Sequence, residues 1–299
     1  MRDDVTVVVV TWNGAEHVER CLASVEGYAT VVVDNGSTDG TVALVRKRFP
    51  GVAVIEQENR GMGGGNNAGM RAARRSGDAT RYWFLLNSDA WVVGDGLERL
   101  GSLADANPRA AVIGPRLSNP DGSLQRSVRG EPTVWRLATE YLFLRKLGPR
   151  SRALNSYYGA GFTHDETREV ESLYGAALLV RAEAAREVGL FDEEFFMFSE
   201  ETDWLHRFRA AGWKVLFTPE AAVVHLGGAS HGGRLYGENL RGILRFLAKH
   251  RGMREAERAR RLLLWSLRAR SLLFRGERGR AYRDGARLLA SGSAEELLS

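Results

Sequence analysis

The chain has 299 residues, of which 44% are hydrophobic and 26% are charged, and its formal net charge is +5. This composition excludes a disordered or fibrous protein, and the length allows one large domain with an extension. A single cysteine, Cys21, excludes a disulfide framework within the chain and favours a reducing compartment. Because no charged-then-apolar leader opens the sequence and no apolar run approaches the roughly 18–20 residues of a membrane span, we expect a cytoplasmic protein.

Strand and helix patterns alternate through the first ninety residues. β-Branched and aromatic runs predict buried strands at 5–10, 30–33, 52–57 and 82–86. Helical patterns over 18–25, 42–49 and 67–76 lie between them, and we expect the glycine-bearing stretch Gly61–Gly65 to be a loop. This alternation predicts an α/β fold with a mainly parallel central sheet and helices on both faces.

The second half of the chain is more irregular. Residues 116–170 are expected to form loops with one helix near Trp135–Leu147. Beyond them we expect a helix over Ala182–Val188, a helix capped by Ser199 that runs to Ala211, and strands at Lys214–Phe217 and Ala222–His225. We therefore divide the chain into a catalytic domain over 1–237, with halves 1–115 and 116–237, and a helical extension over 238–299.

The extension carries the positive charge. Residues 241–299 contain 15 Lys and Arg against 6 Asp and Glu, a balance of +9, which leaves −4 for the first 240 residues. Apolar residues interleave with the arginines and predict amphipathic helices over about 238–250 and 254–290. Such helices either pack on the catalytic domain or lie against anionic lipid, and the sequence leaves both open. Because the extension lacks a recognition-helix pattern and Cys/His fingers, we expect no nucleic acid partner.

Polar clusters follow the ends of the four predicted strands. They are Thr11-Trp12-Asn13, Asp34-Asn35-Gly36, Asn59-Arg60-Gly61 and Asn87-Ser88-Asp89. One aspartate after a strand is ordinarily a turn residue. Ligands of parallel sheets, however, bind at the carboxyl ends of the strands, so four clusters at one edge favour a binding site.

Three further features have both a structural and a functional interpretation. Glu200 and Glu201 in the first turn of a helix are either acids that favour the helix dipole or a general base. A lone His225 at a strand end is more often structural, but together with Asp89 it would suit Mg²⁺ or Mn²⁺. The motif Gly63-x-Gly65-x-x-Ala68 loosely matches a dinucleotide fingerprint, yet it follows the third strand instead of the first, which disfavours an NAD oxidoreductase.

Six segments, taken in order, resemble the family 2 inverting glycosyltransferases of GT-A fold, and in particular the rhamnosyltransferase-like branch that acts in cell-wall and surface-polysaccharide assembly. The segments are VVVVTWNG, VVVDNGSTDGT, ENRGMGGGNNAGM, WFLLNSDAWV, LYGAALLVRAEAAREVGLFDEEFFMFSEETDWLHRFRAAGW and VVHLGG. The resemblance covers about residues 5–230.

The resemblance implies roles for individual residues. The donor nucleotide and sugar would be held by Thr11, Asn13, Asp34, Asn59, Gly61, Asn67 and Ser88. Asp89 and His225 would hold a divalent metal, Mg²⁺ or Mn²⁺. Glu201 would be the catalytic base. Two departures from the family pattern bear on these roles: Asn87 replaces the first acid of the DXD motif, and glutamate replaces the commoner aspartate at the base position, so Glu200 or Asp203 are alternative bases.

The implied reaction is metal-assisted transfer, with inversion, of rhamnose or another hexose from a UDP- or dTDP-sugar. The acceptor would be a hydroxyl of a saccharide or of a polyprenyl-diphosphate-linked molecule, with the extension in peripheral contact with the inner membrane face. A nucleotidyltransferase is one alternative, although "TWNGAEH" lacks the basic residues of an activating loop. A non-catalytic nucleotide-sugar-binding module is another, although it would not require the acid at 201. Donor, acceptor, metal and oligomeric state stay open.

Overall fold

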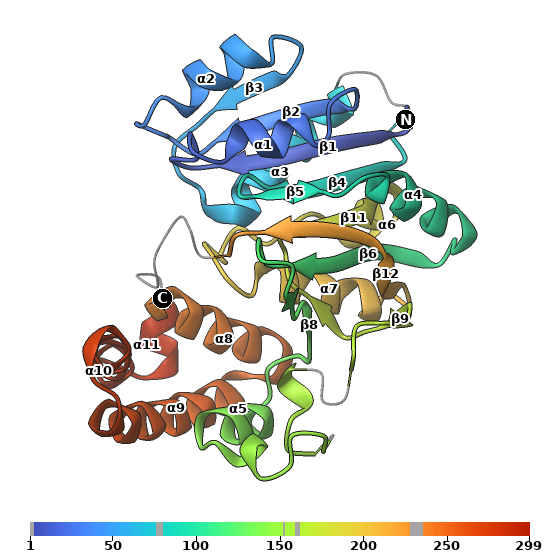
Figure 1. The fold of residues 1–299 in the computed structure, drawn as a ribbon. Coiled ribbons are helices and arrows are strands. Elements are labelled where there is room, and N and C mark those ends of the chain that lie inside the picture. Colours follow the sequence, from blue (N-terminus) through green and yellow to red (C-terminus); the bar gives the residue numbers. More distant parts are fainter. Residues whose placement is uncertain (1–2, 76–79, 152, 159–161, 228–235) are drawn as a thin grey trace.

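The structure is a computed structural model that describes residues 3–75, 80–151, 153–158, 162–227 and 236–299 (Figure 1). A sheet flanked by helices forms the upper part of Figure 1, and a helical bundle lies below it. The strands are β1 (Val5–Thr11), β2 (Ala29–Asp34), β3 (Ala53–Glu56), β4 (Tyr82–Asn87), β5 (Ala90–Val92), β6 (Ala110–Ser118), β7 (Leu124–Gln125), β8 (Val128–Arg129), β9 (Arg168–Glu169), β10 (Ser172–Leu173), β11 (Ala177–Arg181) and β12 (Lys214–His225). The helices are α1 (Val18–Ala23), α2 (Thr41–Arg48), α3 (Gly61–Arg75), α4 (Gly96–Ala106), α5 (Val134–Tyr141), η1 (Leu144–Lys146), η2 (Ser156–Tyr158), α6 (Ala182–Val188), α7 (Glu200–Ala210), α8 (Tyr236–Arg251), α9 (Met253–Leu273), α10 (Gly276–Ala290) and α11 (Ala294–Leu298).

The central sheet is mixed and mostly parallel at its N-terminal edge. Its strand order is β3-β2-β1-β4-β11-β6-β12-β5. β1 pairs in parallel with β2 and β4, and β6 pairs in parallel with β12, whereas β11 runs antiparallel between β4 and β6. The predicted α/β fold with a mainly parallel sheet is therefore confirmed, and the carboxyl ends of β1, β2 and β4 meet at one edge.

Helices cover both faces of this sheet, as predicted. β1 alternates its side chains between two cores: Val7 and Val9 pack with α1, α2 and α4, and Val8 and Val10 pack with α3, α6 and α7. Both sets of valines are fully or almost fully buried. A strand buried on both faces explains why the sequence of β1 is a continuous apolar run without alternation.

The glycine stretch that we expected to form a loop is helical. α3 begins at Gly61, although glycine costs roughly 1 kcal/mol per residue in a helix. Close packing on β1 compensates, because a Cβ at Gly65 would lie 2.6 Å from the side chain of Val10 and one at Gly69 would lie 2.3 Å from that of Val8. The glycines therefore bring the helix onto the sheet at short range.

Three other local predictions were wrong in detail. β12 is one strand with register shifts near Thr218, not two separate strands. Ser199 has a left-handed φ of +69° and makes no side-chain cap to α7, so its hydroxyl does not start that helix. The helix expected near Trp135–Leu147 ends at Tyr141 and is followed by the short η1. Residues 228–235, which include the last glycine of VVHLGG, lie outside the described residues.

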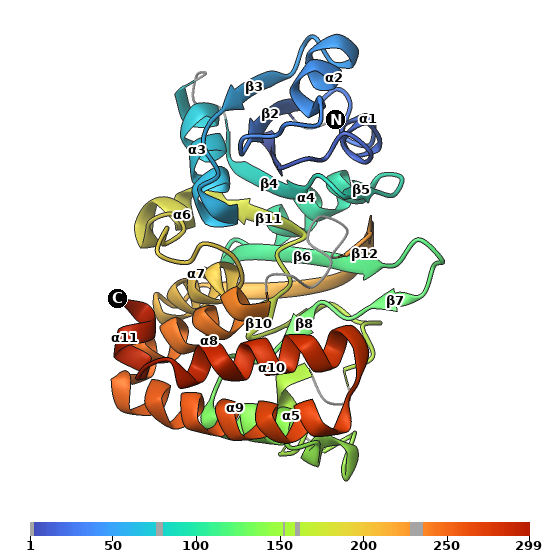
Figure 2. The same cartoon turned by 90° about the vertical axis from the view of Figure 1, so that its left-hand side faces the viewer.

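The predicted C-terminal helices are present and form a bundle with α5 (Figure 2). Their shared core includes Leu137 of α5 and Leu244, Leu263 and Leu289 of the extension. The helix expected over 254–290 is instead two antiparallel helices, since the backbone is extended at Arg275 and left-handed at Gly276, with φ +65°. Within the described residues, no helix is both long and apolar enough to cross a membrane.

Candidate active site

A pocket of about 240 Å³ opens at the carboxyl edge of the sheet. All four polar clusters contribute to its lining, which includes Thr11, Trp12, Asn35, Asn59, Gly61, Asn87, Ser88 and Asp89. Residues from the second half of the chain also line it, including Arg129, Tyr174, Glu200, Glu201 and His225. The topology thus brings together side chains separated by more than 200 positions in the sequence.

Asp89 and His225 face each other across the ends of two strands. Asp89 lies in the turn after β4 and His225 is the last residue of β12, and the backbone N–H of Leu226 donates to the carbonyl of Asp89 at 3.1 Å. His225 Nε2 lies 3.3 Å from Asp89 Oδ1, and both side chains are buried. The structure therefore places these two predicted residues side by side.

Gln125 in β7 fixes the orientation and tautomer of His225. The Nε2 amide group of Gln125 donates to Asn119 Oδ1 at 3.1 Å and to the carbonyl of His225 at 3.3 Å, so its Oε1 must be the acceptor toward the ring. His225 Nδ1 therefore donates to Gln125 Oε1, at 2.7 Å. In the neutral ring this leaves the Nε2 lone pair directed at a carboxylate oxygen, and two such acceptors require a proton or a cation between them.

The donor set at this position fits a divalent metal. Imidazole nitrogen and carboxylate oxygen both bind Mn²⁺ and Mg²⁺, and an outer-shell partner such as Gln125 is the usual means of orienting a ligating histidine. Among the described residues, no cluster of three or more His, Cys, Asp or Glu side chains is suited to hold a metal ion. Further ligands would have to come from water or from a bound phosphate.

Glu200 and Glu201 begin α7 and line the pocket together. The Oε2 atom of each is buried and has no hydrogen-bond partner within the described part of the chain. Burial raises the pKa of both carboxyls, and repulsion from Glu201 raises the pKa of Glu200 further. Arg129 partly opposes the rise in the pKa of Glu201. A desolvated carboxylate with a raised pKa at a rigid helix end is well suited to accept a proton.

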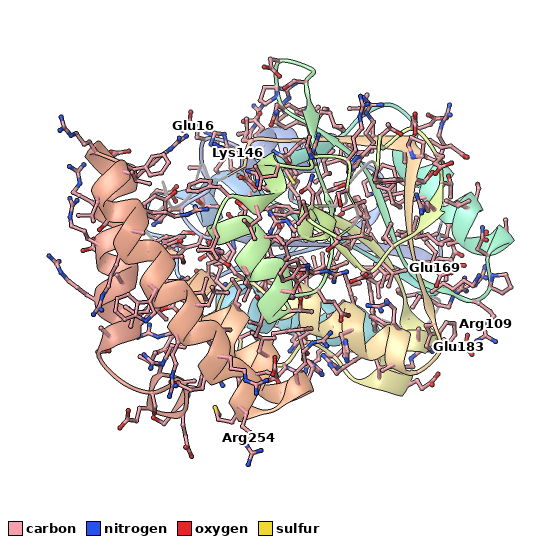
Figure 3. All side chains as sticks on the ribbon, turned by 90° about the horizontal axis from the view of Figure 1, so that it is seen from below. Glu16, Arg109, Lys146, Glu169, Glu183 and Arg254 are labelled. Carbon is pink, nitrogen blue, oxygen red and sulfur yellow. The ribbon has the colours of Figure 1, made fainter. Side chains whose placement is uncertain are left out.

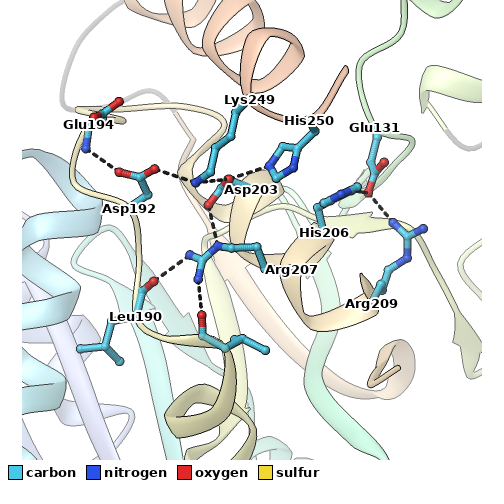
Figure 4. Close-up of polar contacts among 11 residues, drawn as sticks. Glu131, Leu190, Asp192, Glu194, Asp203, His206, Arg207, Arg209, Lys249 and His250 are labelled. Carbon is cyan, nitrogen blue, oxygen red and sulfur yellow. Dashed lines mark hydrogen bonds and ion pairs between the residues drawn. The ribbon is translucent and has the colours of Figure 1, made fainter. Parts of the chain in front are cut away.

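Asp203, the other alternative base, is not among the residues that line the pocket, and Figure 4 shows its polar contacts. It is fully buried between α7 and α8, where Arg207 Nε lies at 2.9 Å, Lys249 Nζ at 2.8 Å and His250 Nε2 at 2.7 Å from its carboxylate oxygens. Arg207 also donates to the backbone carbonyls of Val188 and Leu190. The carboxylate of Asp203 therefore joins the two helices and is not among the groups that line the pocket.

Three of the predicted donor residues are not among those that line the pocket. Asn67 is fully buried, where its amide donates to the carbonyl of Phe191 and accepts from the N–H of the same residue. Asn13 accepts from the backbone N–H of Thr38 at 2.8 Å and so joins the loops after β1 and β2. Asp34 accepts from two N–H groups through Oδ2, while its buried Oδ1 has no partner within the described residues.

Several lining residues escaped the sequence analysis. Arg129 lies in β8, which pairs with β10 in a separate two-stranded sheet, and its guanidinium lies 4.8 Å from the ring centroid of Tyr174. Tyr157 and Asn239 also line the pocket, the latter from α8 in the extension. The arginine- and tyrosine-rich composition of residues 116–170 was visible in the sequence, but two-residue strands leave no periodic pattern.

A family model described as glycosyl transferase family 2 matches residues 6–165, more than half of the chain. The chain belongs to glycosyl transferase family 2. A curated relative, the N-acetylglucosaminyl-diphospho-decaprenol L-rhamnosyltransferase of Mycobacterium tuberculosis, is 34% identical over 241 residues, which are 75% of this chain and 76% of the relative. The pre-mycofactocin glycosyltransferase of the same organism is 29% identical over 74% of this chain and 42% of its own length.

Solved structures of other glycosyltransferases have the same fold as this family 2 member. The mannosyltransferase PcManGT of Pyrobaculum calidifontis, in complex with GDP-Man and Mn²⁺, superposes with a TM-score of 0.55 at 16% identity and covers 100% of this chain and 79% of its own. Residues 1–349 of S. aureus TarS give a TM-score of 0.52 at 15% identity, over 94% and 78% of the two chains. The predicted GT-A fold is confirmed, and the chain is a glycosyltransferase.

Proposed function

We propose that this glycosyltransferase transfers a hexose, with inversion, from a UDP- or dTDP-sugar to a hydroxyl group, and that Glu201 is the general base. The observation that carries the proposal is the shared pocket. The carboxylate of Glu201, whose Oε2 has no hydrogen-bond partner in the described residues, and the Asp89–His225 pair line the same cavity. A base and a metal-binding pair in one pocket match the two charges that develop in a displacement at an anomeric carbon.

In this mechanism the acceptor oxygen attacks the anomeric carbon from the face opposite the nucleoside diphosphate. The new carbon–oxygen bond forms as the bond to the diphosphate oxygen breaks, and the hydroxyl proton passes to Glu201 Oε2. Asp89 and His225 would hold Mg²⁺ or Mn²⁺, which would neutralise the negative charge of the diphosphate. Arg129 favours the ionised form of Glu201, because its charge opposes the rise in the pKa of the carboxyl.

The donor would bind along the edge formed by β1, β2 and β4. The free Oδ1 of Asp34 would accept an N–H of the nucleotide base, and Thr11, Asn59, Gly61 and Ser88 would contact the rest of the donor. Asn13 and Asn67 would act indirectly, through their hydrogen bonds to the backbone of Thr38 and Phe191. We further propose that residues 1–115 bind the donor, that 116–237 supply the base, and that 238–299 complete the acceptor wall through Asn239.

The acceptor is proposed from the curated relative, whose name specifies a diphospho-decaprenol-linked saccharide and an L-rhamnosyl donor group. By this analogy the chain would transfer rhamnose or a similar hexose to a saccharide on a polyprenyl diphosphate, with the protein on the cytoplasmic side of the inner membrane. Membership of family 2 disfavours both a nucleotidyltransferase and a non-catalytic binding module.

Thermal unfolding in the presence of UDP-, dTDP- and GDP-sugars, with and without Mn²⁺ or Mg²⁺, would test the donor. A matching donor at a hundred times its dissociation constant should stabilise the fold by about 2.7 kcal/mol. Calorimetry on Asp89→Ala should show loss of metal-dependent donor affinity with an unchanged fold. NMR of the product should show an anomeric configuration opposite to that of the donor. No stabilisation by any nucleotide sugar, or retention of configuration, would contradict the proposal.

A further inference from the structure

An apolar surface lies around the C-terminal end of α9. We name it the apolar tip, and its residues, with their exposed fractions, are Leu142 (47%), Leu147 (80%), Trp265 (66%), Leu272 (86%) and Leu273 (71%). Burial of such side chains is normally favourable, so a cluster left in water marks an interaction surface.

The apolar tip is made of two segments that are far apart in the sequence and rigidly joined. Arg270 of α9 is buried, and its guanidinium donates to the carbonyls of Glu140 and Tyr141 at the end of α5, at 2.7 and 2.9 Å. The same guanidinium lies 4.1 Å from the ring centroid of Phe143, which in turn stacks on Phe274. Because a cation satisfies the last carbonyls of α5, the segment after that helix is fixed against the end of α9.

Exposed cations surround the apolar tip. They are Lys146, Arg268, Arg275 and Arg278, and none of them forms an ion pair with another residue in the described ranges. By contrast, several arginines elsewhere in the extension are paired, as Arg260 and Arg261 are with Glu257. Carboxylates of the described residues therefore neutralise charge along the bundle but not at these four cations, of which Lys146 lies over the ring of Phe143 and Arg268 over that of Trp265.

The apolar tip lies on the side of the molecule toward which carboxyl ends of the central sheet point, and residues at those ends line the pocket. Figure 2 shows the turn between α9 and α10 on the side toward which the carboxyl end of β6 points. Figure 3 shows Lys146 on the same side as Glu16, which follows the carboxyl end of β1, whereas Arg254 at the start of α9 lies on the opposite side.

We propose that the apolar tip inserts into the interface of an anionic lipid bilayer and holds the pocket mouth beside the membrane surface. Exposed leucines and a tryptophan, encircled by unpaired cations, match the acyl boundary and the anionic headgroups of such a surface. Each basic residue near an anionic membrane contributes on the order of a fivefold change in affinity, and salt weakens this attraction. The purpose of the contact, access to a lipid-linked acceptor, rests on the proposed function; the contact itself does not.

Co-sedimentation with vesicles tests the proposal. The full chain should pellet with vesicles that contain phosphatidylglycerol at low salt, much less at high salt, and weakly with pure phosphatidylcholine. The double variants Leu272→Asp/Leu273→Asp and Arg275→Glu/Arg278→Glu should each lower the partition coefficient at least tenfold. The matched controls are Met253→Asp and Arg254→Glu, which change an exposed apolar residue and an exposed cation at the other end of the same helix and should bind like the parent chain.

Failure to pellet with anionic vesicles, or equal loss in the control variants, would overturn the proposal. So would a dimer in sedimentation velocity that Leu272→Asp/Leu273→Asp dissolves, because the tip would then be an interface between two copies. Turnover on a water-soluble acceptor should be the same in the tip variants and the parent, while turnover on an acceptor in vesicles should fall with binding. Absence of turnover on every acceptor would contradict the proposed function and leave the vesicle result intact.

Discussion

The first turn of α7 carries three carboxylates in two opposite environments. Asp203 is surrounded by Arg207, Lys249 and His250, which hold it between two helices. Glu200 and Glu201 are also buried, but each keeps an oxygen without a partner, and both face the pocket. A buried charge that is fully paired contributes to the fold, whereas one left unpaired costs free energy that only a function would justify. The predictions below separate these two cases.

The largest effect should follow Glu201→Gln, which removes the proposed base and keeps the shape of the side chain. We expect turnover to fall by roughly 10²–10⁴, with donor affinity unchanged, as measured by steady-state kinetics and calorimetry. Glu200→Gln is the matched control next to it and should retain most of the activity. If the effects of the two variants are reversed, Glu200 is the base.

The pH dependence of the rate gives a second view of Glu201. Since a base must be ionised and burial raises the pKa of this carboxyl, the rate should rise with pH through a value above the ordinary range of glutamate. This rise of the rate with pH should be absent from the residual activity of Glu201→Gln. A rise near the ordinary glutamate pKa would contradict the desolvated environment.

Asp203→Asn should destabilise the fold with the active site otherwise intact. The substitution leaves the cations of Arg207 and Lys249 near a neutral amide, and loss of one partner of a buried ion pair typically costs about 3–5 kcal/mol. Urea unfolding would measure the cost, and turnover of the variant well below its unfolding temperature should stay close to that of the parent. A large loss of turnover with unchanged stability would place Asp203 in the chemistry.

Gln125→Ala should weaken metal binding through His225. The variant removes the acceptor that fixes the tautomer of the ring, and loss of such an outer partner costs about 10–100-fold in metal affinity. Titration of the donor complex with Mn²⁺ would measure the change. Gln57→Ala, at a glutamine that bonds Asn35 beside the pocket, is a control that should leave metal affinity unchanged.

Glu200→Gln should have the smallest effect. It should stabilise the fold, whereas Asp203→Asn should destabilise it. A glutamate whose pKa is raised in the folded state gives the fold less stability as pH rises from the ordinary value of 4.5 through the raised one. The neutral amide removes that loss, so melting at pH 7 should shift upward by about 2–4 °C, as roughly 1 kcal/mol does in a large domain. A lower melting temperature at this pH would mean that Glu200 is stabilised by a partner.

The proximity of Asp89 and His225 could be predicted because each lies at or just after the end of a predicted strand, and the carboxyl ends of parallel strands converge. The sequence could not separate Glu201 from Asp203, because the choice depends on α8, which is more than thirty residues further along the chain. It also missed the helical start of α3, where packing of Gly65 and Gly69 on β1 overrides the poor helix propensity of glycine. Arg129 was missed because β8 is two residues long and shows no pattern.

The contribution of α8 to the pocket wall also determines when the pocket can form during synthesis of the chain. The chain emerges from the ribosome N-terminus first, so β1, β2, β4 and the first turn of α7 emerge before residues 236–251. Asn239 still has to arrive to line the pocket, and Gly242 to pack against the carbonyl of Phe198, where a Cβ would lie only 2.5 Å from the oxygen. A nascent chain that already carries Glu201 therefore still lacks part of the pocket wall, which is completed only after residues 236–251 have emerged.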